Sequence, residues 1–316
     1  MAGSYREIDY RLRPAKTAER HMLCDAFRRL RFGSIEGYQY IGLGSVYFSD
    51  FILFHRSLGI DRMVSIEKEA HDKPRFDDNL PFANIEMRYG MSHDELPHID
   101  LSLRTIAWLD YDGMLSKEIL DDVRYFASNT VSGSVLTVTV QCNPEAPKID
   151  DKLAITKRLR ESLGSNRVPL EIDDDALGGW GTGELYRRII VNEIQEVLTS
   201  RNGLRPRLQH IQYGQIFYFF YKDNARMLTT GGVFYDESQK TIFDSCGFSE
   251  LSFVRTDDKP LIIRVPKLTF REIRKLDCQL PLKPGQTITP GSMPASEAEN
   301  YAQIYRYFPN FSIVEL

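Results

Sequence analysis

Residues 38–69 have the sequence YQYIGLGSVYFSDFILFHRSLGIDRMVSIEKE. This order of apolar runs, glycines and a final carboxylate predicts a strand, a glycine turn, a helix and a second strand. Gly42 and Gly44 then lie at the tip of the first strand, where the backbone can pass close to a ligand. Glu67 ends the neighbouring strand, within reach of a ribose. The segment therefore predicts a nucleoside-binding pocket.

The composition is that of an ordinary globular protein. The chain has 316 residues, of which 42% are hydrophobic and 27% are charged, and its net charge is −4. Its four cysteines form no CxxC pair, so we expect neither a zinc cluster nor a disulfide framework. No apolar run approaches the roughly 20 residues of a membrane helix, and the N-terminus lacks the apolar core of a signal peptide. We expect a cytoplasmic protein without membrane contact.

Basic residues concentrate in two places, the first thirty residues and the stretch from Lys259 to Lys275. Two interpretations of these stretches stay open. Each is either a solvated helix face or a surface that meets phosphate or RNA.

The pattern of apolar residues beyond the opening segment continues the alternation of strand and helix. An amphipathic helix is predicted over 15–31, further strands over 84–89, 106–110 and 134–142, and a helix over 117–127. This alternation predicts an α/β fold with a doubly wound, mostly parallel, Rossmann-like sheet.

The rhythm changes after the fifth predicted strand. Residues 144–183 hold three prolines and the run GGWGTG, which predicts an irregular insertion or lid. A helix is predicted over 184–200, and two β-rich runs around Asp223 predict a terminal hairpin. Capping boxes at Thr269 and Ser296 predict two C-terminal helices, which either pack on the main domain or form a surface for a second copy or a partner subunit. The predicted organisation is a basic helical segment (1–37), a Rossmann-like domain (38–244) with the insertion (144–183), and a C-terminal extension (245–316).

The spacing of the glycines in the turn distinguishes dinucleotide-binding folds from folds that bind a ligand without a pyrophosphate. Dinucleotide folds require GxGxxG, because the third glycine lets the helix pack closely on the strand. Tyr47 occupies that third position. The segment thus disfavours NAD or FAD and favours a ligand without a pyrophosphate.

The glycine turn, the acid at Glu67 and the hairpin around Asp223 together resemble the class I S-adenosylmethionine-dependent methyltransferases over residues 38–236. The resemblance implies a seven-stranded sheet that ends in an antiparallel hairpin, and S-adenosylmethionine as the cofactor. Gly42, Leu43 and Gly44 would lie beneath its methionine portion, and Glu67 would accept hydrogen bonds from both ribose hydroxyls.

Three further residues are candidates for cofactor binding. Met91 and Asp94 follow the third predicted strand, and the resemblance places them near the adenine. The family often has an acidic residue there, whereas this chain has Gly90-Met91-Ser92. Lys16, at the start of the first predicted helix, is a candidate for covering the cofactor's carboxylate.

The fourth predicted strand ends in Asp110-Tyr111-Asp112-Gly113, where the superfamily holds the methyl acceptor. This run is similar to the Asp-Pro-Tyr-Gly type of the tRNA guanine-N2 dimethyltransferases and the three-Cys-motif partner proteins, but it lacks the proline. Asp110 or Asp112 would take a proton or stabilise developing charge, and Tyr111 would stack on a planar acceptor or pack into the fold. The resemblance thus implies a methyltransferase that acts on RNA, DNA or a nucleotide-like acceptor.

Two other functions stay open at this stage. The missing proline is compatible with a non-catalytic, nucleotide-binding subunit of a larger complex, possibly a defence complex. An NAD-dependent oxidoreductase is the second alternative. The cluster Ser92-His93-Asp94-Glu95 lacks the spacing of a metal site, and Cys142 at a strand tip is a weaker candidate nucleophile.

Overall fold

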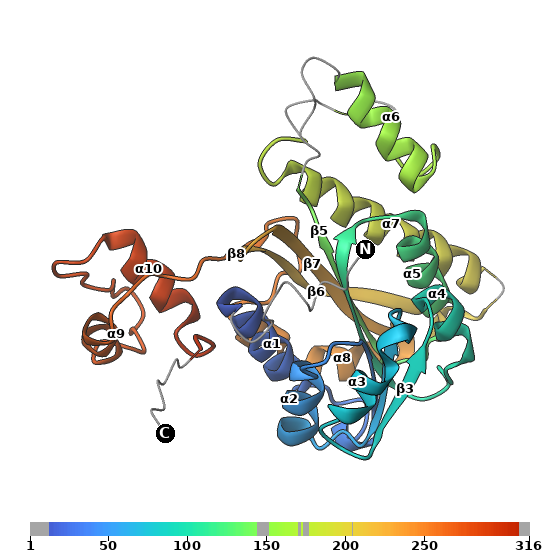
Figure 1. Cartoon of the computed structure of the whole chain (residues 1–316), viewed down its shortest axis with the longest axis horizontal. Coiled ribbons are helices and arrows are strands. Elements are labelled where there is room, and N and C mark those ends of the chain that lie inside the picture. Colours follow the sequence, from blue (N-terminus) through green and yellow to red (C-terminus); the bar gives the residue numbers. More distant parts are fainter. Residues whose placement is uncertain (1–12, 144–151, 170–171, 173–176, 204, 310–316) are drawn as a thin grey trace.

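The computed structural model describes residues 13–143, 152–169, 172, 177–203 and 205–309, and Figure 1 shows its arrangement. Its strands are β1 (Gln39–Leu43), β2 (Arg62–Glu67), β3 (Ile85–Tyr89), β4 (Thr105–Met114), β5 (Val135–Gln141), β6 (Ile211–Lys222), β7 (Arg226–Asp236) and β8 (Leu261–Ile263). Its helices of four residues or more are α1 (Pro14–Phe27), α2 (Ser49–Leu58), α3 (Lys73–Asp78), α4 (Ser92–Glu95), α5 (Lys117–Asn129), α6 (Lys152–Leu163), α7 (Gly181–Asn202), α8 (Lys240–Ser245), α9 (Phe270–Asp277) and α10 (Ala295–Ile304).

All strands of the described chain join one sheet, in the order β3-β2-β1-β4-β5-β7-β6-β8. The first five strands are parallel, and β7 pairs antiparallel with both β5 and β6. The predicted doubly wound sheet with an antiparallel hairpin is confirmed. The difference is an eighth strand, β8, which pairs parallel with β6. Its three residues are too few to give a recognisable alternation in the sequence.

Side chains on the two faces of the sheet build separate cores. Along β4, Ile106 and Trp108 join one core and Ala107 and Leu109 join the other, as the two-residue period of a strand requires. Helices α1 and α2 cover the first face and α5 and α7 cover the second (Figure 1). Ligand-binding crevices of such folds lie at the carboxyl ends of the parallel strands.

Several predicted boundaries shift. Helix α1 ends at Phe27 rather than at residue 31. Strand β4 continues through the acidic tip to Met114, with a register shift against β5 after Asp110. Helix α7 starts at Gly181, because the glycine-rich run that predicted a loop also supplies its first turn. Part of the predicted insertion, residues 144–151, 170–171 and 173–176, lies outside the described residues.

The C-terminal segment forms a small helical unit beside the sheet, with its own core of Leu276, Met293, Ala298 and Tyr301 (Figure 1). The capping box of Thr269 and Glu272 is confirmed. The one predicted at Ser296 is wrong, because α10 begins a residue earlier with Pro294 at its N-cap. Phe270, the first residue of α9, is 60% exposed.

Candidate cofactor and active site

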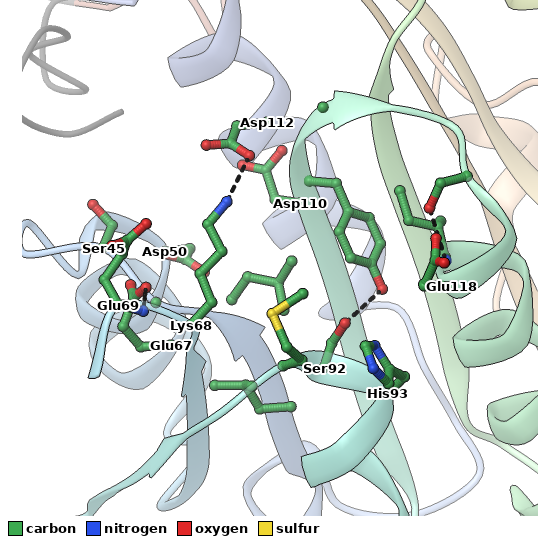
Figure 2. A pocket seen from close by; sticks show the side chains of 18 of the residues that line it. Ser45, Asp50, Glu67, Lys68, Glu69, Ser92, His93, Asp110, Asp112 and Glu118 are labelled. Atoms are coloured by element: carbon green, nitrogen blue, oxygen red, sulfur yellow. Dashed lines mark hydrogen bonds and ion pairs between the residues drawn. The ribbon is translucent and has the colours of Figure 1, made fainter. Parts of the chain in front are cut away.

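A cavity of about 370 Å³ opens at the carboxyl ends of β1, β2 and β4, and Figure 2 shows side chains that line it. Its volume is within the range of small-molecule sites. The glycine turn, the end of β2, the turn after β3 and the tip of β4 all contribute lining residues. Segments from four separate parts of the predicted pocket therefore meet around one space.

The two glycines of the turn face different surroundings. Gly44 lines the cavity, and a Cβ added to it would lie 2.8 Å from Oε2 of Glu67. A Cβ on Gly42 would instead lie 2.8 Å from the hydroxyl of Tyr40 and 3.0 Å from Phe51, inside the core. Gly44 thus allows the Glu67 side chain to lie over the turn, whereas Gly42 allows the packing of α2 on the sheet. Leu43, between them, also lines the cavity.

Glu67 is a buried carboxyl group that faces the cavity. Its side chain is 5% exposed, and its Oε1 accepts a hydrogen bond from the backbone N–H of Glu69 at 2.8 Å. Burial raises the pKa of Glu67 to about 7, and the neighbouring carboxylates of Glu69 and Asp112 also raise it. A ligand that donates hydrogen bonds to this group would favour its ionised form.

Of the two residues predicted near the adenine, Met91 lines the cavity and is 47% exposed. Asp94 is not part of the lining and lies 3.7 Å from Nε2 of His93. The turn after β3 contributes Ser92 and His93 instead. Short turns between β3 and α4 place consecutive side chains on different sides, which the sequence alone did not resolve.

Tyr111 lines the cavity, and its hydroxyl group is hydrogen-bonded within the protein. This hydroxyl donates to Oδ2 of Asp122 on α5 at 2.6 Å, and the hydroxyl of Ser92 donates to the same oxygen at 2.5 Å. Burial, followed by the charge of Asp122, raises the pKa of Tyr111 well above its usual value. Tyr111 therefore stays protonated and anchors the strand tip to α5. Asp122 was not predicted, since it lies inside a helix pattern.

The two aspartates at the tip of β4 have different cationic partners. Oδ1 of Asp110 lies 2.7 Å from Nζ of Lys16, and Oδ1 of Asp112 lies 3.3 Å from Nζ of Lys68. Figure 2 shows Lys68 reaching across from the side of Glu67 toward Asp112. Both carboxylates line the cavity, with side chains 28% and 43% exposed.

Lys16 lies behind Asp110 and not in the cavity lining, although its predicted place was over the cofactor. Its side chain is fully buried, 2.8 Å from Glu19, 3.1 Å from the hydroxyl of Tyr221 and above the Trp108 ring. Burial raises the pKa of Glu19, while Lys16 opposes that shift. The ammonium group is therefore paired with protein groups and fixes the position of the Asp110 carboxylate.

The lining also holds charged residues that were not predicted, among them Arg20 on α1 and Asp50 on α2. Arg20 is 8% exposed, and the hydroxyl of Tyr40 donates a short hydrogen bond to Oδ2 of Asp50. The available signal was the four-residue spacing of Lys16 and Arg20, which places both side chains on one face of α1.

No group of three or more His, Cys, Asp or Glu side chains is arranged to hold a metal ion in the part of the chain that the structure covers. Among those same residues, every helix is either too short or too polar to cross a bilayer.

Comparison with protein families decides the identity of the chain. Residues 8–316 match the model of the family described as "Putative O-methyltransferase". The chain belongs to this family. This match confirms the predicted S-adenosylmethionine-dependent methyltransferase, and the sheet has the Rossmann-like topology that the resemblance implied. The NAD-dependent oxidoreductase is set aside.

Solved structures of methyltransferases are similar at low identity. The O-methyltransferase TomG from Streptomyces achromogenes, in complex with SAM, is 16% identical over 69% of this chain and 79% of its own, with a TM-score of 0.37. Trm1 from Pyrococcus horikoshii, with S-adenosyl-L-methionine, is 12% identical over 78% of this chain and 64% of its own, with a TM-score of 0.46. None of the curated proteins compared with the chain matches it.

Proposed function

We propose that this methyltransferase transfers the methyl group of S-adenosylmethionine to an oxygen atom of a nucleic acid or nucleotide-like acceptor at the tip of β4. The observation that carries the proposal is the meeting of Gly44, Glu67 and Asp110 around one cavity. The family description supports an oxygen acceptor.

The donors and acceptors of the cavity fit the cofactor. Glu67 presents a buried carboxyl group beside the close-packed turn at Gly44, where a ribose with two hydroxyl donors would be held. Met91 offers an apolar surface to the adenine ring. When bound, the cofactor supplies a methyl group that its sulfonium already activates.

Asp110 is the residue that we place beside the acceptor hydroxyl. Its Oδ1 is held by Lys16, while its side chain lines the cavity and is 28% exposed. A carboxylate in this position aligns the hydroxyl and accepts its proton as the new C–O bond forms. Lys16 acts through Asp110 and is a positioning residue.

The surface of the C-terminal unit supports a nucleic acid as the acceptor. Its first helix and the preceding residues carry exposed basic side chains that form no ion pair with a described residue, at Arg264, Lys267, Arg271, Arg274 and Lys275. The nearby acids are engaged, since Glu272 caps α9, Asp277 accepts from Tyr301 and Glu297 accepts from the backbone of Lys267. Phe270, the first residue of the same helix, is 60% exposed, and exposed aromatic and basic side chains together are typical of proteins that bind phosphates and stack bases.

Transfer of a labelled methyl group from S-adenosylmethionine tests the proposal. The acceptors are total RNA, total DNA and a panel of small alcohols and phenols, each with the wild type and with Asp110→Asn. We expect label in nuclease-sensitive material, and a loss of about 10²- to 10⁴-fold in the variant because the proton acceptor is removed.

Binding of the product S-adenosylhomocysteine is the control, and it should be equal in wild type and Asp110→Asn. Label found only in small molecules overturns the nucleic-acid acceptor. Equal turnover of the two proteins overturns the role of Asp110.

A further inference from the structure

The two basic stretches of the sequence have different surroundings in the structure. In the first, Arg13, Lys16, Arg28 and Arg29 each form an ion pair with an acidic side chain of the protein. In the second, residues 259–275, no basic side chain forms an ion pair with a described residue. The whole chain has a net charge of −4, so this stretch is a local concentration of positive charge on an acidic protein. Its charge is available to an anionic partner.

Helix α9 carries part of this charge on one side. Residues three and four apart share a face of a helix, and Ile273 and Leu276 pack in the core of the C-terminal unit. Four side chains of the helix are exposed, and we call them the outer face of α9: Phe270, Arg271, Arg274 and Lys275. The outer face thus combines one aromatic ring with basic groups.

One acidic residue of α9 interacts with the outer face. Glu272 forms the capping box with Thr269, whose hydrogen bonds lower its pKa, and the charge of Lys275 contributes to that shift. Arg271 and Arg274 form no ion pair with a described residue, and like charges three residues apart on a helix repel each other. A chain of phosphates would offset this repulsion, because it supplies a negative charge to each guanidinium.

The exposed apolar surface of α9 is too narrow for a membrane. A helix that lies on a bilayer buries a continuous apolar face in it. Ile273 and Leu276 pack in the protein core instead, and Leu276 is fully buried. Phe270, by contrast, is 60% exposed and four residues from Arg274, so its ring lies beside a cation. Such a ring stacks on a base whose face is free, and unpaired bases have this free face whereas bases inside a duplex do not.

We propose that the outer face of α9 binds single-stranded nucleic acid, with Arg271 and Arg274 on backbone phosphates and Phe270 stacked on an unpaired base. It rests on the nucleic-acid acceptor of the proposed function and names the surface that holds that acceptor.

The C-terminal unit is attached to the helix that supports the tip of β4. The hydroxyl of Tyr307 donates to Oδ2 of Asp25 on α1 at 2.8 Å, and its ring packs edge-on against Phe253. Helix α1 also carries Lys16, whose ammonium group pairs with Asp110. A nucleic acid held on α9 is therefore bound to the same folded body as the active site.

Binding of labelled RNA, measured by fluorescence anisotropy at several salt concentrations, tests the proposal. The probes are an oligouridine of about 20 nucleotides, longer than one such surface covers, and the duplex that it forms with oligoadenosine. The proteins are the full-length wild type, Phe270→Ala and the double variant Arg271→Gln with Arg274→Gln.

Each variant has a matched control elsewhere on the surface. Leu208→Ala also removes an exposed apolar side chain, since Leu208 is 64% exposed. Lys157→Gln with Lys240→Gln removes the same charge from α6 and α8, where the two lysines pair with Glu161 and Asp244.

We expect the double arginine variant to bind oligouridine about tenfold more weakly, with a salt dependence (log Kd against log salt) lower by about 1.4, because two phosphate contacts are lost. Phe270→Ala should weaken binding about 5- to 100-fold, the range for one stacked base, and keep the salt dependence of the wild type. Duplex RNA should bind the wild type more weakly than oligouridine, and Phe270→Ala should not change duplex binding. Both controls should stay within about twofold of the wild type.

Each contrary outcome overturns a named part of the proposal. Equal binding of single strand and duplex, with no effect of Phe270→Ala, overturns the stacked base. Equal losses in the lysine control overturn the assignment to α9. Loss of binding to vesicles of phosphatidylserine and phosphatidylcholine in the arginine variant, with RNA binding unchanged, makes the face a membrane surface and overturns the proposal.

Methyl transfer separates this surface from the proposed function. If oligouridine binds as expected but label from S-adenosylmethionine enters only small molecules, the nucleic-acid acceptor is wrong while the binding surface stands. If RNA is methylated but the arginine variant binds and methylates it as the wild type does, the acceptor stands and the surface is overturned.

Discussion

Lys16 and Arg20 lie one helical turn apart on α1, and both carry a buried positive charge, yet their surroundings are opposite. Lys16 contacts Asp110, Glu19 and Tyr221 and is fully buried. Arg20 has a buried Nε without a partner and lines the cavity. The difference teaches that burial of a charge alone does not mark a binding residue. A cation whose partners are all protein groups organises the site, whereas one that forms no ion pair with a described residue is available to a ligand.

The strongest test of this comparison is the stability of two matched variants. Lys16→Met leaves Asp110 and Glu19 without their shared cation, so we expect the free energy of unfolding to fall by about 3–5 kcal/mol. Arg20→Met removes a charge that forms no ion pair with a described residue, so its loss should stay below about 1 kcal/mol. Denaturant unfolding of the ligand-free proteins measures both values. The double variant Lys16→Met with Glu19→Gln should recover part of the loss, and equal losses for the two single variants would contradict the comparison.

The pH dependence of cofactor binding distinguishes Glu67 from Arg20, which also lines the cavity. The pKa of Glu67 is raised to about 7, so the carboxyl group is protonated below that pH in the ligand-free protein. Ribose hydroxyls donate to the ionised form, so binding releases a proton and is favoured as pH rises through 7. We expect the affinity for S-adenosylhomocysteine to weaken about tenfold for each pH unit below 7.

Calorimetry between pH 5.5 and 8, in buffers of different ionisation enthalpy, measures both the affinity and the proton release. Glu67→Gln should remove the pH dependence, while Arg20→Met should lower the affinity and keep its pH profile. A flat profile for the wild type would refute the role of Glu67.

Gly42 and Gly44 differ in the same way, because Gly42 packs in the core whereas Gly44 lines the cavity. Gly42→Ala adds a methyl group against Tyr40 and Phe51, so we expect a loss of about 1–3 kcal/mol in stability with little change in binding of S-adenosylhomocysteine. Gly44→Ala adds one against Glu67, so we expect weaker binding with a smaller loss of stability. Thermal unfolding and calorimetry of both variants measure these effects. If Gly42→Ala proved to be the variant that loses binding, our placement of the turn would be incorrect.

The smallest effect is expected at the exposed ion pair of Lys68 and Asp112. Their side chains are 49% and 43% exposed, so Lys68→Gln should change the free energy of unfolding by less than about 0.5 kcal/mol. Denaturant unfolding checks this value against Lys16→Met, whose pair with Asp110 is enclosed. A large loss at Lys68 would show that exposure does not separate the two pairs.

Prediction from the sequence succeeded where the signal is local. The segment 38–69 has its pattern of strand, turn, helix and strand within about thirty residues, and the structure brings Gly44 and Glu67 together as that order requires. The capping box at Thr269 is equally local and is confirmed. The box at Ser296 fails, since the same residue pattern lies inside a helix that starts at Ala295.

Prediction was incomplete where partners come from distant parts of the chain. Asp110 and Tyr221, the partners of Lys16, lie 94 and 205 residues away. On α1 the sequence places Glu19 three residues after Lys16, where it pairs with the ammonium group, but this spacing does not predict the contact with Asp110. The cofactor-binding and catalytic roles of the named residues stay predictions until the measurements above are made.

The sequence by itself determined the alternation of strands and helices, the glycine turn and the carboxylate that ends β2, because periodicity and short spacings act within one βαβ unit. Only the tertiary structure decided which basic residue is neutralised and which faces the cavity. The physical reason is that the electrostatic environment of a side chain depends on groups that folding brings to it, and for Lys16 these groups come from strands β4 and β6 in addition to Glu19 on α1 itself.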